Sequence, residues 1–195
     1  CSCTEILASF VESTLILSTI IAASGQRYSR KKTICLTILC AVMLTLYLVF
    51  MNGLSSFSFL TPIVTMLLSI FLVGKLVSNG NELLRATSCV LALFVIQSID
   101  YILIIGMAFP LGNPRELFFD FLEPGLIRII FLLVDKVCDI LLYLWAKKYL
   151  AKFSTMRNRI MAFLLVCTTL AYITMQYLIA MVLHGDFIQL QGAAI

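Results

Sequence analysis

Charged residues are scarce in this chain of 195 residues. They make up 12% of it, about half the share found in a typical soluble domain. Histidine occurs once, at His184, so a site that needs several converging imidazole ligands is excluded, and we expect no metal ion. Strands of alternating polar and apolar residues are also absent, which excludes a transmembrane barrel. The chain therefore has neither the composition of a soluble domain nor the pattern of a barrel.

Apolar residues dominate instead, at 62% of the chain with a mean hydropathy of +1.06. Six apolar stretches each reach the roughly 20 residues that a helix needs to cross a bilayer. No soluble domain separates them, so we predict an all-α transmembrane bundle that forms a single domain over residues 1–195 and is surrounded by membrane lipid. The predicted spans are about 4–23, 33–51, 59–77, 84–109, 125–146 and 160–183.

Basic residues predict the orientation. Three turns, "GQRYSRKK", the turn after the third span and "KKYLAKFSTMRNR", hold 11 of the 14 Lys and Arg residues, and all three fall on one side if six spans alternate. That side is expected to be cytoplasmic, which places both ends of the chain and the loop "PLGNPRELFFDFLEPG" outside. We prefer this interpretation of "RYSRKK" to a nucleic-acid patch. Because the chain begins at Cys1 and stops at "FIQLQGAAI" after a span, we expect it to be a fragment of a longer protein.

The cysteines do not predict a disulfide framework or a catalytic site. Five of the seven lie inside predicted spans, where cysteine behaves as a small hydrophobic residue. Cys167 and His184 are 17 residues apart, roughly 25 Å along one helix, so a peptidase pair is not supported. We expect no catalytic residue and no cofactor in this segment, and we expect His184 to cap the end of the sixth span.

The fifth span is unusual because it carries four charges. At 100° per residue, Arg128, Asp135 and Asp139 fall within about 40° of one another, and Lys136 lies at the flank of this stripe. Exposure to lipid would cost about 2.5–3.5 kcal/mol per charge. The stripe is therefore expected to face protein or water.

Other spans offer polar partners for this stripe, which together predict an intramembrane polar network. Four acids against two bases would leave a net charge of −2 if all were ionised, so protonation or water entry is expected. The network has two interpretations: it fixes helix register, or it switches between two arrangements or binds a solute. Its predicted members are Glu12, Gln97, Asp100, Arg128, Asp135, Lys136 and Asp139.

The outer loop before the fifth span combines aromatic and charged residues. Pro114 can open a short helix there, and Pro124 with Gly125 ends it. The loop is either an interfacial amphipathic turn that rests on lipid headgroups or the lip of a pocket for an external peptide or small ligand. The ligand-binding candidates are Arg115, Glu116, Phe118, Phe119, Asp120, Phe121 and Glu123.

The layout of "EILASFVESTLIL", the basic turn "RYSRKK", the charged fourth and fifth spans and "LLYLWAKKYLAKF" resembles the membrane sensor region of Agr-type peptide-pheromone receptor histidine kinases of Gram-positive bacteria. The resemblance covers nearly the whole chain but includes no diagnostic short motif. It implies a secreted peptide ligand, a homodimer formed through regions outside this chain, and a cytoplasmic kinase domain of the GHKL type. The phosphoacceptor histidine and the nucleotide-binding motifs of such a kinase do not occur in these residues, so any kinase activity belongs to the full-length protein.

Two other classes also fit a chain of this size. One is the substrate-binding membrane component of a small-solute uptake transporter, although no clear small-xxx-small pattern is seen for contact with an ATPase-linked partner. The other is a membrane peptidase, which the missing Cys and His pair argues against. The hypothesis that follows from the resemblance is that a ligand at the outer loop shifts the fourth and fifth spans and re-pairs Asp100, Arg128 and Asp135.

Overall fold

A computed structural model describes residues 3–53, 60–108 and 125–184, and every named element in these ranges is a helix. This confirms the predicted all-α class, and each helix overlaps one predicted span. The helices are α1 (Cys3–Ser24), α2 (Arg30–Gly53), α3 (Leu60–Val77), α4 (Glu82–Ala108), α6 (Leu126–Phe153) and α7 (Asn158–His184).

Three of these helices are long and apolar enough to cross a membrane, over Cys3–Ser24, Glu82–Ile104 and Asn158–Leu178. Helix α6 is as long as these, but Asp135, Lys136 and Asp139 near its middle make the helix less apolar. The length and composition of the three apolar helices are compatible with a membrane protein. The count of about six spans stays a prediction.

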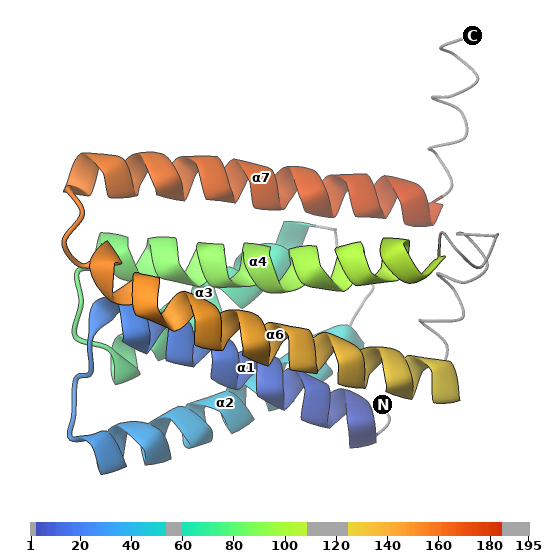
Figure 1. Cartoon of the computed structure of the whole chain (residues 1–195), viewed down its shortest axis with the longest axis horizontal. Helices are drawn as coiled ribbons and strands as arrows, with labels where there is room; N and C mark the ends of the chain where they lie inside the picture. The colour runs from blue at the N-terminus through green and yellow to red at the C-terminus, as the bar shows by residue number, and fades with distance from the viewer. Residues whose placement is uncertain (1–2, 54–59, 109–124, 185–195) are drawn as a thin grey trace, which may run out of the picture.

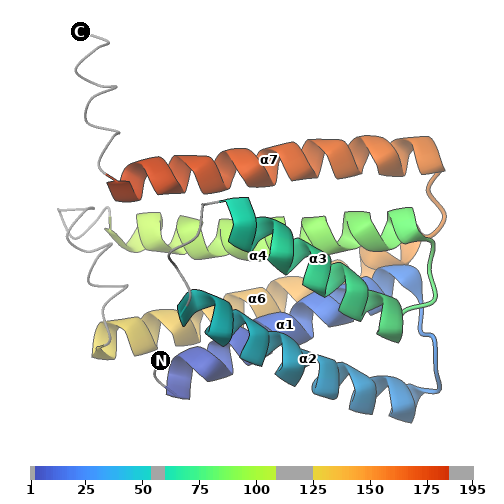
Figure 2. The same cartoon turned by 180° about the vertical axis from the view of Figure 1, so that it is seen from behind.

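Helix α1 lies at the centre of the bundle, where it packs against α2, α3, α4 and α6 (Figures 1 and 2). Helix α7 packs against the outer side of α4 in both views. Leu17 and Ile20 of α1 are completely buried and belong to the main apolar core, which also includes Leu93 of α4 and Tyr172 of α7. Two of the helices that contribute to this core, α1 and α4, also pack against α6.

The turns after α1 and α3 lie together at one end of the bundle because their backbones are joined. Gly25 ends α1 with a φ of 81°, a left-handed conformation that glycine adopts without strain. The next residue, Gln26, forms a β-bridge with Ser78 after α3. Gly80 packs so closely on Ser24 that an added Cβ would lie 2.5 Å from the Ser24 Cβ. The sequence of these turns therefore fixes how α1, α3 and α4 meet.

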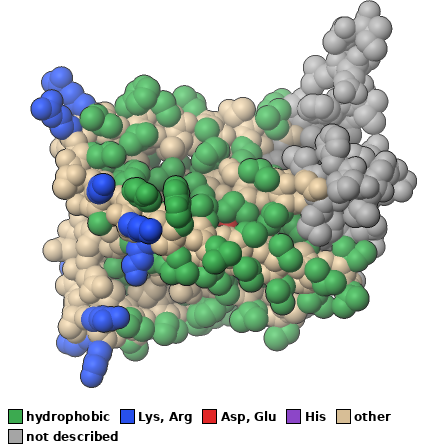
Figure 3. Space-filling view, viewed as in Figure 1, with side chains coloured by type: hydrophobic (Ala, Val, Ile, Leu, Met, Phe, Trp, Pro, Cys, Tyr) green, Lys and Arg blue, Asp and Glu red, His purple; other side chains and the backbone are tan. Residues whose placement is uncertain are grey.

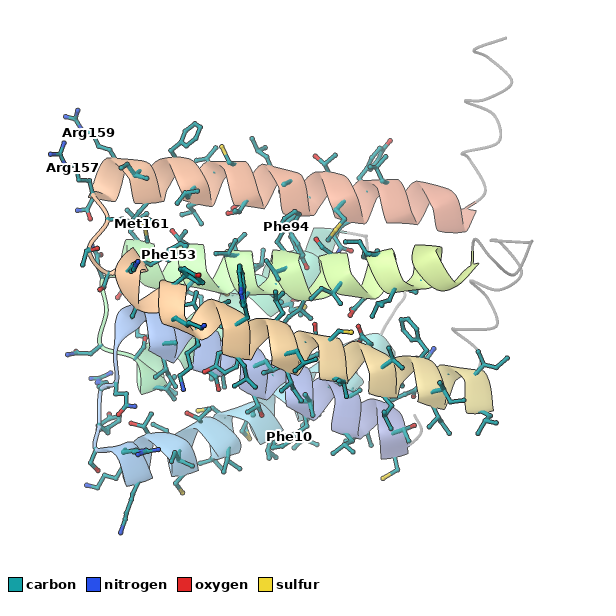
Figure 4. The ribbon with its side chains drawn as sticks, viewed as in Figure 1. Phe10, Phe94, Phe153, Arg157, Arg159 and Met161 are labelled. Atoms are coloured by element: carbon teal, nitrogen blue, oxygen red, sulfur yellow. The ribbon has the colours of Figure 1, made fainter. Side chains whose placement is uncertain are left out.

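Hydrophobic side chains cover the visible face of the bundle, and the basic side chains gather at the end where these turns lie (Figure 3). Arg157, between α6 and α7, and Arg159, at the start of α7, project from this same end (Figure 4). The exposed rings of Trp145 and Tyr149, in the last turns of α6, lie against each other at a tilt of 50°, with centroids 5.2 Å apart. An apolar surface that ends in aromatic and then basic residues is typical of a protein that meets a membrane interface.

Candidate functional site

The inward face of α6 carries three charged residues within little more than one helical turn. Asp135, Lys136 and Asp139 are only 1%, 7% and 3% exposed. Charged groups are this deeply buried in proteins only when they are paired, because an isolated charge loses its hydration. The arrangement around these three side chains is therefore the strongest candidate for a functional site in the described residues.

Lys136 is the centre of this arrangement. Its Nζ lies 2.5 Å from a carboxylate oxygen of Glu12 in α1, 2.6 Å from Asp135 and 3.1 Å from Asp139. Asp100 of α4 lies further away, at 3.7 Å. One ammonium group therefore connects α1, α4 and α6. We call these five residues the Lys136 cluster.

The Lys136 cluster holds more acids than its single base can satisfy. A lysine ammonium has three N–H donors, whereas four carboxylates surround it. The formal charge of the cluster is −3 when all five groups are ionised. Each of its three aspartates also has a buried Oδ1 that lacks a hydrogen-bond partner among the described residues. The cluster is thus acid-rich and has free acceptor capacity.

Arg128 does not belong to this cluster, contrary to our expectation from its position in the stripe. Its Nη2 lies 2.8 Å from Glu5 at the start of α1. Arg128 is seven residues from Asp135, or about 10 Å along the helix axis, so the neighbouring helix offers a nearer acid. The cluster consequently has one base rather than two, and Lys136, expected at the flank, is at its centre.

Gln97 forms a separate polar contact. It hydrogen-bonds Gln176 of α7 and so connects α4 to α7, on the other side of α4 from α6. Tyr172, which is almost completely buried, also hydrogen-bonds Gln97. The predicted network is therefore divided into three parts: the Lys136 cluster, the Arg128–Glu5 pair and the Gln97 contact.

The carboxylate oxygens of Glu12, Asp100 and Asp135 lie within 4.8 Å of one another, a spacing that can also hold a metal ion. The Lys136 ammonium already contacts all three residues and supplies a positive charge there. This geometry therefore does not require a metal ion, and the absence of a metal stays a prediction.

The predicted residues of the outer loop, 115–123, lie outside the described part of the chain, so the ligand-binding candidates stay predictions.

His184 is the last residue of α7. The cysteines in the described ranges are free thiols, and two of them, Cys40 and Cys89, are buried as small hydrophobic residues.

Sequence reasoning missed the role of Arg85, which it used only to count charges. This side chain is 3% exposed, and its guanidinium donates to the Ser78 hydroxyl at 2.9 Å and to the Gly80 carbonyl at 2.8 Å. It also pairs with Glu82 at 2.8 Å. The spacing of an arginine three residues after a glutamate near a Gly-containing turn was the available signal. Arg85 therefore holds the turn between α3 and α4 in place.

Comparison with known protein families, with curated proteins and with solved structures finds no match to this chain. The resemblance to pheromone-receptor kinases therefore depends on the layout of the sequence alone.

Proposed function

We propose that this chain is the N-terminal membrane sensor module of a two-component receptor histidine kinase. It binds an extracellular peptide or small ligand and relays a helix rearrangement to a cytoplasmic kinase in the full-length protein. The observation that carries this proposal is the shared ammonium of Lys136, for which four carboxylates on three helices compete.

Competition for one cation gives a bundle two arrangements of similar energy. Lys136 is close to Glu12 of α1 and 3.7 Å from Asp100 of α4. A small shift of α6 exchanges these partners, strengthening its connection to α4 at the expense of α1. The re-pairing hypothesis thus takes Lys136 in place of Arg128. A ligand drives such an exchange only if it binds the two arrangements with different affinities.

The ends of the bundle suit this direction of signalling. The basic turns, which are expected to be cytoplasmic, lie at one end, and the start of α6 lies at the other (Figure 1). A ligand bound near the outer end of α6 would therefore act about two helical turns from Lys136, next to Arg128. On this proposal the active protein is a homodimer in the cell membrane, with both ends of the present chain outside.

The test uses the full-length protein in proteoliposomes with radiolabelled ATP. We expect phosphohistidine in the wild-type protein and a rate changed by about fivefold or more in Lys136→Met, since allosteric coupling is typically of this size. Val137→Met, on the exposed face of the same helix, is the matched control and should behave as wild type. Asp100→Asn removes only the most distant partner of Lys136 and serves if Lys136→Met does not fold.

Two results would overturn the proposal. One is a full-length wild-type protein that forms no phosphohistidine. The other is a folded Lys136→Met or Asp100→Asn protein whose phosphorylation rate equals that of Val137→Met under all conditions.

A second candidate function is the substrate-binding membrane component of a small-solute uptake transporter. A partly open cavity between α1, α4 and α6, lined in part by Asp139, favours this alternative. Copurification with an ATPase subunit, in place of phosphohistidine formation, would distinguish it from the sensor.

A further inference from the structure

A partly open cavity of about 90 Å³ lies between α1, α4 and α6 and follows α6 from its middle toward its basic end. The α6 residues in its lining run from Asp139 to Leu150, which is about 16 Å along the helix axis. The hydrocarbon core of a bilayer is about 30 Å thick, so this length matches one leaflet. The cavity therefore has the length of a lipid acyl chain in a single leaflet.

The few polar residues of the lining do not require a polar occupant. The Thr19 hydroxyl donates to the Leu15 carbonyl at 2.9 Å, and the Tyr143 hydroxyl hydrogen-bonds Ser18. The Asp139 side chain is completely buried, so its carboxylate does not contact an occupant of the cavity. Water there would lack the roughly three hydrogen bonds that a buried water usually makes. An apolar chain fits this lining better than water does.

The cavity opens between α4 and α6, at a surface that would face lipid in a membrane. Leu91 and Val95 of α4 line it and are partly exposed, as are Leu142 and Ala146 of α6. Hydrophobic side chains cover this face of the bundle (Figure 3). An acyl chain can therefore enter sideways from the bilayer without crossing a polar surface.

Two exposed aromatic rings border the opening near the basic end of α6. Tyr143 points toward α1, because its hydroxyl hydrogen-bonds Ser18. At 100° per residue, Trp145 and Tyr149 lie about 160° and 120° around the helix from Tyr143, so they are on the side away from α1. Lys152 lies on this side too, with its ammonium 5.9 Å from the centre of the Tyr149 ring. Aromatic rings beside a lysine are typical of a helix at the level of lipid headgroups.

The charge at this end of α6 is unbalanced. Residues 147–159 carry five bases and no acid, and none of these bases forms an ion pair within the described ranges. The five are Lys147, Lys148, Lys152, Arg157 and Arg159. In the turn between α3 and α4, by contrast, Lys75 and Arg85 both pair with Glu82. The complementary partner of the end of α6 is therefore an anion, and at headgroup level in a membrane that anion is a lipid phosphate.

We propose that this surface binds an anionic phospholipid, with one acyl chain in the cavity and the phosphate on the lysines at the end of α6. Lys152 and Lys148 are one turn apart, exposed, and on the same side of the helix as the aromatic rings, so they contact the phosphate. A zwitterionic lipid offers the chain without the net charge, and a soluble phosphate offers the charge without the chain. This inference does not depend on the proposed sensor role.

The test is native mass spectrometry of the protein in detergent micelles, titrated with phosphatidylglycerol or with phosphatidylcholine of the same acyl chains. We expect the first phosphatidylglycerol to bind about thirtyfold more tightly, because each of two bases at a lipid surface contributes about fivefold in affinity. Lys148→Gln with Lys152→Gln should remove most of this preference. Lys31→Gln with Lys32→Gln, which removes the same charge from exposed positions of α2, is the matched control and should keep it.

The contribution of the acyl chain is tested separately. Ala146→Leu narrows the cavity and should weaken binding of both lipids by about fivefold or more, while Val137→Leu, at an exposed position of α6, should bind as wild type. Glycerophosphoglycerol, which is the headgroup without its chains, should not displace the lipid. This displacement measurement still tests the chain if Ala146→Leu does not fold.

Four results would each overturn the proposal. They are equal affinity for the two lipids, an equal loss in the two double-lysine variants, a folded Ala146→Leu protein that binds both lipids as wild type does, and displacement by glycerophosphoglycerol. The last result would show that a soluble anion is enough to occupy the site.

Discussion

Lys136 of α6 and Glu12 of α1 form an ion pair of 2.5 Å between residues 124 positions apart in the sequence. A second pair, Arg128 with Glu5, joins the same two helices at 2.8 Å. The acids are seven residues apart in α1 and the bases eight apart in α6, or about two turns in each helix. Because both numbers rise together, α1 and α6 run in parallel, and charge matching fixes their register.

The close approach of Gly80 to Ser24 predicts that a methyl group is not tolerated there. In Gly80→Ala the new Cβ would lie 2.5 Å from the Ser24 Cβ and 2.9 Å from its Cα, so the two turns must separate. We expect the free energy of unfolding, measured by steric trapping in bicelles, to fall by about 1–3 kcal/mol.

Gly106→Ala is the matched control, since an added Cβ at that position meets nothing within 4 Å. It should leave stability unchanged or raise it by up to about 1 kcal/mol, because alanine favours a helix over glycine. Equal losses in the two variants would contradict the packing described for the turn.

We predict a large loss of stability when Arg85 is replaced, although the sequence alone placed it only among the basic residues of a turn. Arg85→Ala leaves the Gly80 carbonyl and the Ser78 hydroxyl without this donor, and we expect a loss of about 2–3 kcal/mol of unfolding free energy. Arg27→Ala removes an exposed arginine that donates to the Lys75 carbonyl at 3.1 Å and should cost less than about 1 kcal/mol. The assigned role of Arg85 is wrong if both variants lose the same amount.

The predicted orientation can be tested with single cysteines in a variant that lacks the native ones. Ser154→Cys lies beside the basic turns and Gly125→Cys at the other end of α6, and both positions are exposed. On intact cells, a membrane-impermeant maleimide should label Gly125→Cys, and should label Ser154→Cys only after permeabilisation. The reverse pattern would place the basic turns outside.

The helices could be predicted from the sequence because apolar runs of about 20 residues have few other folds in a chain with so little charge. The spacing of the charged residues of α6 also predicted that they share one face of the helix. It did not predict which acid pairs with which base. A projection of one helix puts Arg128 with Asp135, but the pairing depends on the acids that α1 presents, and thus on the register of two helices.

The central position of Lys136 was missed for a related reason. Its Cα lies at the flank of the stripe, yet the long flexible stem carries the ammonium back to Asp135 and Asp139. The packing of Gly80 was hidden because it depends on a contact with Ser24, in a turn more than 50 residues away in the sequence. Residues 115–123, named as ligand candidates, lie outside the described ranges.

The central claim is that the single ammonium of Lys136 holds the acids of three helices together, and the unfolding free energy of Lys136→Met in bicelles tests it most directly. We expect a loss of about 3–5 kcal/mol, because the change leaves buried carboxylates without their cation. Adding Glu12→Gln and Asp135→Asn to this variant should restore at least half of the loss, while Val137→Met should change nothing. A Lys136→Met protein as stable as Val137→Met would contradict the account.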